Sequence, residues 1–210
     1  MENDKIRVVL SFCKGAPYVA KIYLLFFGTT EFMTEINSLE AAFARGVLLL
    51  SDTSYGFLLS VFGAGIIIGS MINSLFAKQL AVNRLIGFGT TFAAVGYVLL
   101  YGSHHLYVAA AGVFLIGLAV TFANTGFLTF YQNHVPVKVM GRFGSIFSII
   151  EAVCIVGLTT LIGLAAELAS IRPVVLISSG GFVLLALFAL KAVMGRERER
   201  YFSEGLYHDK

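Results

Sequence analysis

Residues 55–80, YGFLLSVFGAGIIIGSMINSLFAKQL, and residues 143–168, FGSIFSIIEAVCIVGLTTLIGLAAEL, are two similar apolar stretches that stand 88 positions apart (143 − 55). Aligned at this spacing, they are identical at Gly56 and Gly144, Ser60 and Ser148, Ala64 and Ala152, Ile67 and Ile155, Gly69 and Gly157, Ala77 and Ala165, and Leu80 and Leu168. Other apolar runs keep the spacing to within one residue: they begin near Tyr18 and Leu106, and near Leu85 and Pro173. The spacing predicts a repeat of three spans. The alternative is that two Gly-rich membrane helices share these identical residues by chance.

The composition places the chain in a lipid bilayer. It is 58% hydrophobic and 13% charged, with a mean hydropathy of +0.85, whereas soluble domains are about half apolar and a quarter charged. A helix that crosses the hydrocarbon core needs about 20 mostly apolar residues. Six stretches meet this length: 18–37, which can continue through Leu39 to Arg45, 54–76, 85–103, 106–131, 143–165 and 173–194. They are too long and too uniformly apolar for barrel strands, so we expect helices.

The predicted fold class is therefore all-α integral membrane, with six transmembrane helices in a domain spanning residues 18–195. Because each repeat, 18–103 and 106–194, holds three spans, the second repeat must be inverted relative to the first. Such three-plus-three inverted repeats occur in secondary transporters.

The cations predict the orientation. On the side of the two termini the six spans leave thirteen Lys and Arg residues, and on the other side only Arg45 and Arg172. By the positive-inside rule both termini are cytoplasmic, in a multi-pass protein of the cell membrane. The net charge of +3 then needs no nucleic-acid partner. Tyrosines near the span ends are expected at the membrane interface: Tyr18, Tyr23, Tyr55, Tyr97, Tyr101, Tyr107 and Tyr131.

The two ends of the chain are predicted to lie outside the bundle. Residues 1–17 form a cytoplasmic amphipathic segment, in which a short apolar run with basic flanks (5–14) lies in the interface. A secretory signal is the rival interpretation, but Lys14 and Lys21 interrupt the apolar run and no small-residue cleavage site follows. Residues 196–210 form a charged cytoplasmic tail.

Two acidic residues are predicted near the middle of the membrane. Glu31 lies ten residues after Lys21 and Glu151 nine after Arg142, which places them about 15 Å and 13.5 Å deep in a ~30 Å hydrocarbon layer. A carboxyl group there is protonated when sealed in lipid and ionises when water reaches it, so both residues are candidates for proton coupling. The alternative is a neutral carboxyl that is hydrogen-bonded to a neighbouring helix, or one that pairs with a cation elsewhere.

Polar residues on the first and fourth stretches share one helical face and are candidates for a substrate cavity: Thr30, Thr34, Glu35, Thr121, Asn124 and Thr125. Asn124 is the one most expected to contact substrate, since Ser and Thr in membrane helices commonly bond their own backbone. Glu35 is expected near the outer mouth, paired with Arg45. The third and sixth stretches carry almost no charge and are expected to face lipid. Small residues are expected to let helices pack closely, namely Gly56, Gly65, Gly69, Gly144 and Gly157.

No pattern of catalytic residues accompanies these spans. The four histidines, His104, His105, His134 and His208, all fall in predicted loops or the tail, and no His-Glu-x-x-His, Cys-x-x-Cys or phosphate-binding loop occurs. Cys13 and Cys154 fall in different environments, so neither a disulfide nor a metal site is expected. We therefore expect no enzyme activity, no metal and no cofactor.

The chain resembles the C-terminal six-helix half of a major facilitator superfamily transporter over residues 5–200, most closely the macrolide-efflux-like multidrug exporters. The resemblance rests on the inverted plan, on SDTSYGFLLSVFGAG (51–65) and on VPVKVMGRFGS (135–145). The loop 73–84 departs from the family, because it lacks the acidic residue and the Gly-Arg pair of the gating motif.

The resemblance implies that the first and fourth spans line a central cavity, and that the protein is a secondary active transporter, or its C-terminal half. It also implies efflux of a small amphipathic compound such as a drug, which we expect to be coupled to protons. One half encloses no cavity, so the expected partner is an N-terminal six-helix half or a second copy in a parallel homodimer. The alternative is a truncated, non-transporting membrane interaction protein that packs against such a half or against itself.

Overall fold

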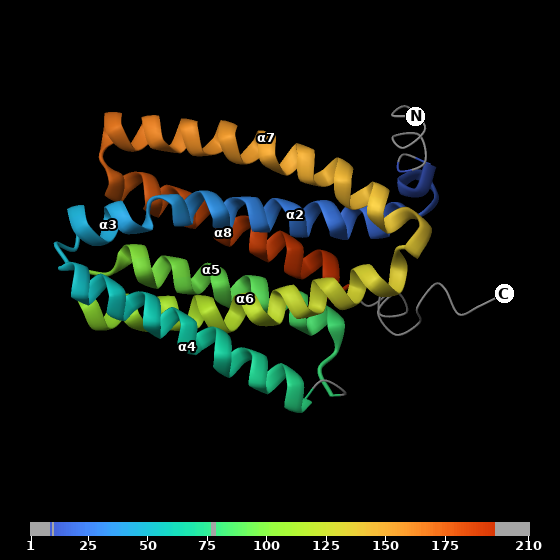
Figure 1. Cartoon of the computed structure of the whole chain (residues 1–210), viewed down its shortest axis with the longest axis horizontal. Helices are drawn as coiled ribbons and strands as arrows, with labels where there is room; N and C mark the ends of the chain where they lie inside the picture. The colour runs from blue at the N-terminus through green and yellow to red at the C-terminus, as the bar shows by residue number, and fades with distance from the viewer. Residues whose placement is uncertain (1–8, 10, 77–78, 196–210) are drawn as a thin grey trace.

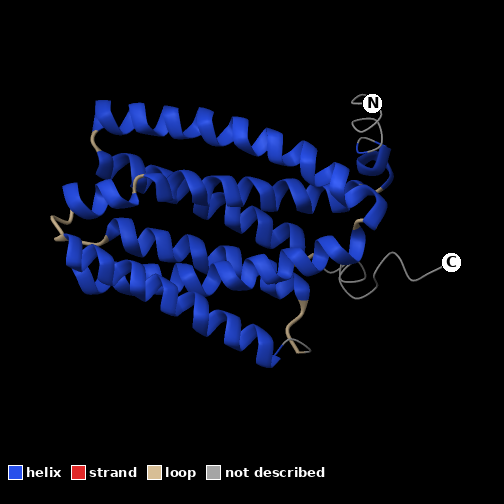
Figure 2. Ribbon diagram, viewed as in Figure 1, coloured by secondary structure: helices blue, strands red, loops and turns tan. Residues whose placement is uncertain are grey.

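The structure, a computed structural model, describes residues 9, 11–76 and 79–195 (Figure 1, Figure 2). Its long helices lie side by side along one axis of the molecule. The helices are α2 (Pro17–Ser38), α3 (Glu40–Gly46), α4 (Asp52–Phe76), α5 (Val82–Gly102), α6 (Leu106–His134), α7 (Val137–Ala169) and α8 (Ile171–Val193). The described residues contain no strand, which confirms the predicted all-helical class.

Five of these helices, α4 to α8, are long and apolar enough to cross a membrane. The remaining predicted span, the first stretch (18–37), coincides with α2, which has 22 residues but contains Lys21, Glu31 and Glu35. These charged side chains lower the hydropathy of α2 below that of the other helices. The chain is therefore a multi-pass membrane protein, while α2 as a span stays a prediction.

The first predicted stretch does not continue as one helix to Arg45. Helix α2 ends at Ser38, and α3 begins one residue after Leu39. The guanidinium of Arg45 lies 3.0 Å from the carboxylate of Asp52, at the start of α4. Burial raises the pKa of the half-buried Glu40 carboxyl at the start of α3. Of the predicted segments outside the bundle, residues 1–8, 10 and 196–210 lie outside the described residues.

Helix α5 lies between α6 and α8, and close glycine contacts join it to α6. A Cβ atom added at Gly96 would lie 2.9 Å from the carbonyl oxygen of Gly112, and one at Gly112 would lie 2.7 Å from the Leu100 nitrogen. The two backbones therefore approach as closely as glycine alone allows. The expectation that this third stretch faces lipid is wrong for most of its surface, because α5 is the most buried of the five candidate spans.

Tyr97 and Tyr101 of α5 lie in the core, which corrects their expected place at the membrane interface. Both side chains are 0% exposed. The Tyr97 hydroxyl donates to Asn37 Oδ1 at 2.8 Å, and the Tyr101 hydroxyl donates to the Ile36 carbonyl at 2.7 Å. The last carbonyls of a helix lack their usual partners one turn further on. The Ile36 carbonyl accepts a 3.3 Å bond from the Leu39 N–H, and Tyr101 adds a shorter one where α2 ends before α3.

We expect the Tyr101→Phe variant to lose about 1 kcal/mol of stability, because the Ile36 carbonyl then loses a buried hydrogen bond. Stability can be measured by titrating the purified protein with a denaturing detergent and taking the midpoint of the change in the far-UV circular dichroism signal. Tyr107→Phe is the matched control, since that side chain is 82% exposed. Equal midpoints for the two variants would contradict this role of Tyr101.

Candidate substrate and proton pathway

Helices α2 and α7 run in the same direction and meet in a constant register. The rings of Tyr23 and Phe147 lie 4.5 Å apart at their centroids, and Thr159 Oγ1 lies 2.8 Å from Glu35 Oε2. Both pairs are separated by 124 positions (147 − 23 and 159 − 35). At the same register Glu151 lies level with Phe27 and Glu31 level with Ile155. The three acidic candidates of the sequence therefore line one seam between α2 and α7.

Glu31 and Glu35 are buried in this seam, with exposed fractions of 4% and 1%. Thr159 donates a hydrogen bond to Glu35. Both carboxyl oxygens of Glu31 and the second oxygen of Glu35 have no hydrogen-bond partner among the described residues. Burying a carboxylate without a hydrogen-bond partner or a cation is costly, so the seam is an unfavourable place for negative charge while it is closed.

The expected pairing of Glu35 with Arg45 is wrong. Arg45 pairs with Asp52 instead, and its guanidinium also lies 5.7 Å from the centre of the Tyr55 ring. Glu35 points toward α7, where it accepts the hydrogen bond from Thr159, and Glu31 stands one turn earlier on the same helix face. The acidic seam consequently has no compensating cation within the described part of the chain.

A cavity of about 160 Å³ opens beside Glu151. Its lining comes from α2, α6 and α7: Tyr23, Phe26, Phe27, Thr30, Phe127 and Glu151. The rings are in mutual contact, with Phe26 stacked on Phe127 at 3.9 Å and Tyr23 against Phe127 at 5.3 Å. Glu151 is half-buried and has no hydrogen bond or ion pair among the residues that the structure describes. A single carboxyl group therefore stands against aromatic rings.

A second cavity, of about 180 Å³, lies between α2, α5 and α6. It brings together three of the predicted cavity residues, Thr30, Thr34 and Asn124, with Met33, Asn37 and Thr90. The Asn124 side chain is exposed. Thr30 lines both cavities, so the two are neighbours along α2.

The other predicted polar residues of α6 face α4 rather than these cavities. The Asn73 amide of α4 donates to Thr125 Oγ1 at 2.9 Å and to the Thr121 carbonyl at 3.2 Å. The Thr121 hydroxyl donates to the Gly117 carbonyl one turn back. Thr30 and Thr34 likewise donate to the carbonyls of Phe26 and Thr30. Each of these three hydroxyls therefore bonds to a backbone carbonyl of its own helix, as Ser and Thr commonly do in membrane helices.

The predicted packing glycines divide into two groups. A Cβ atom at Gly69 would lie 3.0 Å from the Leu118 carbonyl oxygen, and one at Gly65 would clash with the Phe114 carbonyl, so both glycines bring α4 onto α6. At Gly56, Gly144 and Gly157 an added Cβ would meet nothing within 4 Å. These three do not pack against another described helix.

Several residues around the candidate site are not predicted from the sequence. Tyr23 is expected only at the membrane interface, and Phe27 and Phe127 of the cavity beside Glu151 are not singled out. Thr159 and Asn73, which bond to Glu35 and Thr125, are not singled out either. The available signal was the helical spacing of Tyr23 and Phe27, which places both on one face one turn apart. Their partners stand more than 100 positions away, and spacing along one helix does not identify them.

No group of three or more His, Cys, Asp or Glu residues that could hold a metal ion occurs in residues 9, 11–76 and 79–195. Cys13 and Cys154 are both free thiols. The arrangement offers carboxyl groups, threonine hydroxyls and aromatic rings at the middle of a helix bundle. These groups can carry a proton and contact an amphipathic molecule.

A family model, MFS_3, described as transmembrane secretion effector, matches residues 16–204. The match covers the six long helices and the two cavities. No curated protein matches the chain.

Proposed function

The chain belongs to the MFS_3 family of transmembrane secretion effectors, which are transporters of the major facilitator type, and we propose that it exports a small amphipathic compound in exchange for protons. It works as a secondary active transporter or as the C-terminal half of one. The observation that carries the coupling is the buried Glu31 carboxyl, which has no partner among the described residues. The other features described below support the substrate class and the assembly.

The proposed fold is a three-plus-three inverted repeat of six spans. The 88-residue spacing relates α2 to α6, α4 to α7, and α5 to α8. Two kinds of helix contact follow the same relation: α4 packs on α6 as α7 packs on α2, and α5 packs on α6 as α8 packs on α2. Among the described residues, the contact between α7 and α8 has no such counterpart between α4 and α5. This correspondence supports α2 as a membrane span in addition to α4 to α8, in spite of its charged residues.

Proton coupling in this proposal uses Glu31 and Glu151. When the seam between α2 and α7 is sealed, desolvation keeps the Glu31 carboxyl protonated. When water enters from one side of the membrane, the carboxyl ionises and releases its proton there. Alternating exposure to the two sides then moves one proton for each cycle of the transporter.

The substrate in this proposal is an amphipathic compound with a positively charged group. Aromatic rings attract cations through their faces, and the attraction is stronger where water is excluded. The cavity beside Glu151 supplies Tyr23, Phe26, Phe27 and Phe127, and the carboxylate supplies the opposite charge. A volume near 160 Å³ fits a quaternary ammonium group, while the neighbouring cavity at Asn124 offers polar contacts for the rest of the molecule.

Assembly with a second six-helix unit is part of the proposal. Helices α4 and α7 lie at opposite edges of the bundle (Figure 1) and expose large apolar side chains, among them Ile67, Met71, Val153 and Leu161. The open sides of Gly56, Gly144 and Gly157 lie on the same two helices. Close approach of another helix at these glycines would cover both edges. The partner is an N-terminal half or a second copy in a parallel homodimer in the cell membrane, with both termini in the cytoplasm.

The test is gradient-driven movement of ethidium, an amphipathic aromatic cation, in proteoliposomes. One preparation contains the chain alone, and another contains the chain co-produced with an N-terminal six-helix half of the same family. We expect an imposed proton gradient to drive ethidium accumulation in at least one preparation. Cross-linking in native membranes reports which assembly forms. An assembled complex that moves no ethidium in either preparation would favour the non-transporting interaction protein.

A further inference from the structure

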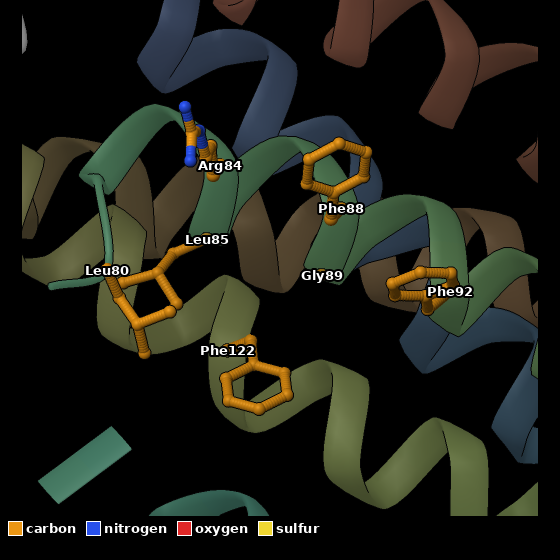
Figure 3. Close-up of a pocket in the computed structure, with 7 residues that line it drawn as sticks. All are labelled: Leu80, Arg84, Leu85, Phe88, Gly89, Phe92 and Phe122. Carbon is orange, nitrogen blue, oxygen red and sulfur yellow. The ribbon is translucent and has the colours of Figure 1, made fainter. Parts of the chain in front are cut away.

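A groove of about 320 Å³ lies between α5 and α6 (Figure 3). None of its lining residues lines the two cavities described above. Phe88 and Phe92 of α5 form one side, and Phe122 of α6 forms the other. Leu80, Leu85 and Gly89 complete the apolar lining, and Arg84 stands near the start of α5. The groove is therefore a hydrophobic surface with one cation at its end.

The floor of the groove is closed. A Cβ atom at Gly89 would lie 2.5 Å from the Ala123 nitrogen, because the α5 and α6 backbones touch there. The rings along the rim stay accessible, with Phe88 42% and Phe92 47% exposed. The groove is therefore accessible at its rim and does not lead into the bundle interior.

The start of α5 is an unsatisfied helix N-terminus. Its N-cap residue is Ala81, which makes no side-chain cap hydrogen bond, and no acidic residue stands in the first turn. Among the described residues, no acceptor takes a hydrogen bond from the Val82 or Asn83 N–H, while the Arg84 N–H is bonded to Asn83 Oδ1. Free N–H groups and the helix dipole attract an anion.

Arg84 lies in the first turn of α5, so its guanidinium adds a full positive charge at this end of the groove. The side chain is exposed and pairs with no acidic residue in the described part of the chain. Arginine and backbone N–H groups together form strong hydrogen bonds to phosphate oxygens. No carboxylate of the first turn is available to a positively charged lipid amine.

We propose that this groove binds an anionic phospholipid, with its phosphate at the N-terminus of α5 against Arg84 and one acyl chain along Phe88, Phe92 and Phe122. The predicted orientation places Arg84 on the cytoplasmic side, where anionic lipids attract basic residues. A net negative headgroup is selected because the site offers positive charge and no partner for an amine. This lipid site is separate from the α2–α7 seam and does not depend on the proposed transport.

The test is retention of lipid by the purified full chain, measured by native mass spectrometry after equilibration with phosphatidylglycerol or phosphatidylcholine of identical acyl chains. We expect phosphatidylglycerol to be retained preferentially. Arg84→Gln should weaken its retention about tenfold or more, as expected for loss of a hydrogen-bonded charge. Arg142→Gln, a matched change at the exposed start of α7, should leave retention unchanged. Far-UV circular dichroism and gel filtration confirm that each variant is folded.

Three results would overturn the proposal. Equal retention of the two lipids, or equal losses for the Arg84 and Arg142 variants, would mean that the lipids bind only as a general annulus. Displacement of phosphatidylglycerol by glycerol phosphate as readily as by lysophosphatidylglycerol would indicate a site for free anions that does not use the groove. Capture of another protein by a photo-cross-linker at position 92 in native membranes, in place of lipid, would assign the groove to a protein partner.

Discussion

The Glu31→Gln and Glu151→Gln variants are expected to lose proton-driven transport completely while they accumulate in the membrane at the level of the unaltered protein. Gln keeps the size and the hydrogen-bonding capacity of the side chain, but it cannot release a proton. Glu31 is buried without a partner among the described residues, so its only contribution that Gln cannot replace is ionisation.

The measurement separates coupling from binding. Uphill ethidium accumulation under a proton gradient should fall to background in both variants. Exchange of ethidium across the vesicle membrane with no gradient needs no proton release, so Glu31→Gln should retain it. Glu151→Gln should also weaken exchange, because its carboxylate faces the aromatic cavity.

Glu167→Gln is the matched control, since this residue lies on α7 but is exposed near the end of the helix. We expect normal transport from it. Undiminished uphill transport by Glu151→Gln or Glu31→Gln would refute the role of that residue. Equal loss of uphill transport and exchange by Glu31→Gln would indicate a structural role instead of proton coupling.

Gly112→Val is expected to have the largest effect on folding stability. Its Cβ would lie 2.7 Å from the Leu100 nitrogen and 2.9 Å from the Gly96 carbonyl oxygen, both backbone atoms that cannot move independently of α5. The helices would have to separate, with loss of packing along the α5–α6 contact. Overpacking of this kind costs about 1–3 kcal/mol and sometimes more, so we expect reduced yield and a lower unfolding midpoint.

Gly180→Val, in α8, tests whether valine in a membrane helix is itself destabilising. An added Cβ at Gly180 meets nothing within 4 Å, so this variant should unfold close to the midpoint of the unaltered protein. Thermal unfolding followed by gel filtration measures both. A Gly112→Val variant as stable as Gly180→Val would disprove the close α5–α6 contact.

The helix positions could be predicted because lipid imposes a local rule. Backbone groups in hydrocarbon must bond within their own segment, so a long apolar stretch becomes a helix whatever surrounds it. The stretch 106–131 predicted α6 well, and 54–76 predicted α4 almost to its ends. The stretch 143–165 was too short, since α7 extends over Val137–Ala169. Polar residues such as Lys138 and Glu167 lie near the ends of α7, so a prediction based on the length of the apolar run stops short of them.

The candidate site could be predicted only in part. The acidic residues were found because charge in a membrane is rare and costly. The partner of Glu35 was not, because Arg45 is close in sequence whereas Thr159 is 124 positions away. Tyr97 and Tyr101 were assigned to the interface from their place near a span end, but the rotation of α5 turns them toward α2.

The amino-acid sequence alone determined that this protein is a bundle of membrane helices, since that follows from the transfer of short apolar segments into lipid, and it predicts carboxyl groups near mid-depth. Only the tertiary structure decided which side chains meet. It placed the Glu35 carboxyl against Thr159 of α7, gathered aromatic rings around Glu151, and opened a groove that Arg84 helps to line. The physical reason is that apolar length fixes the depth of a residue in the membrane, whereas helix rotation and backbone approach at glycines such as Gly96 and Gly112 fix its neighbours.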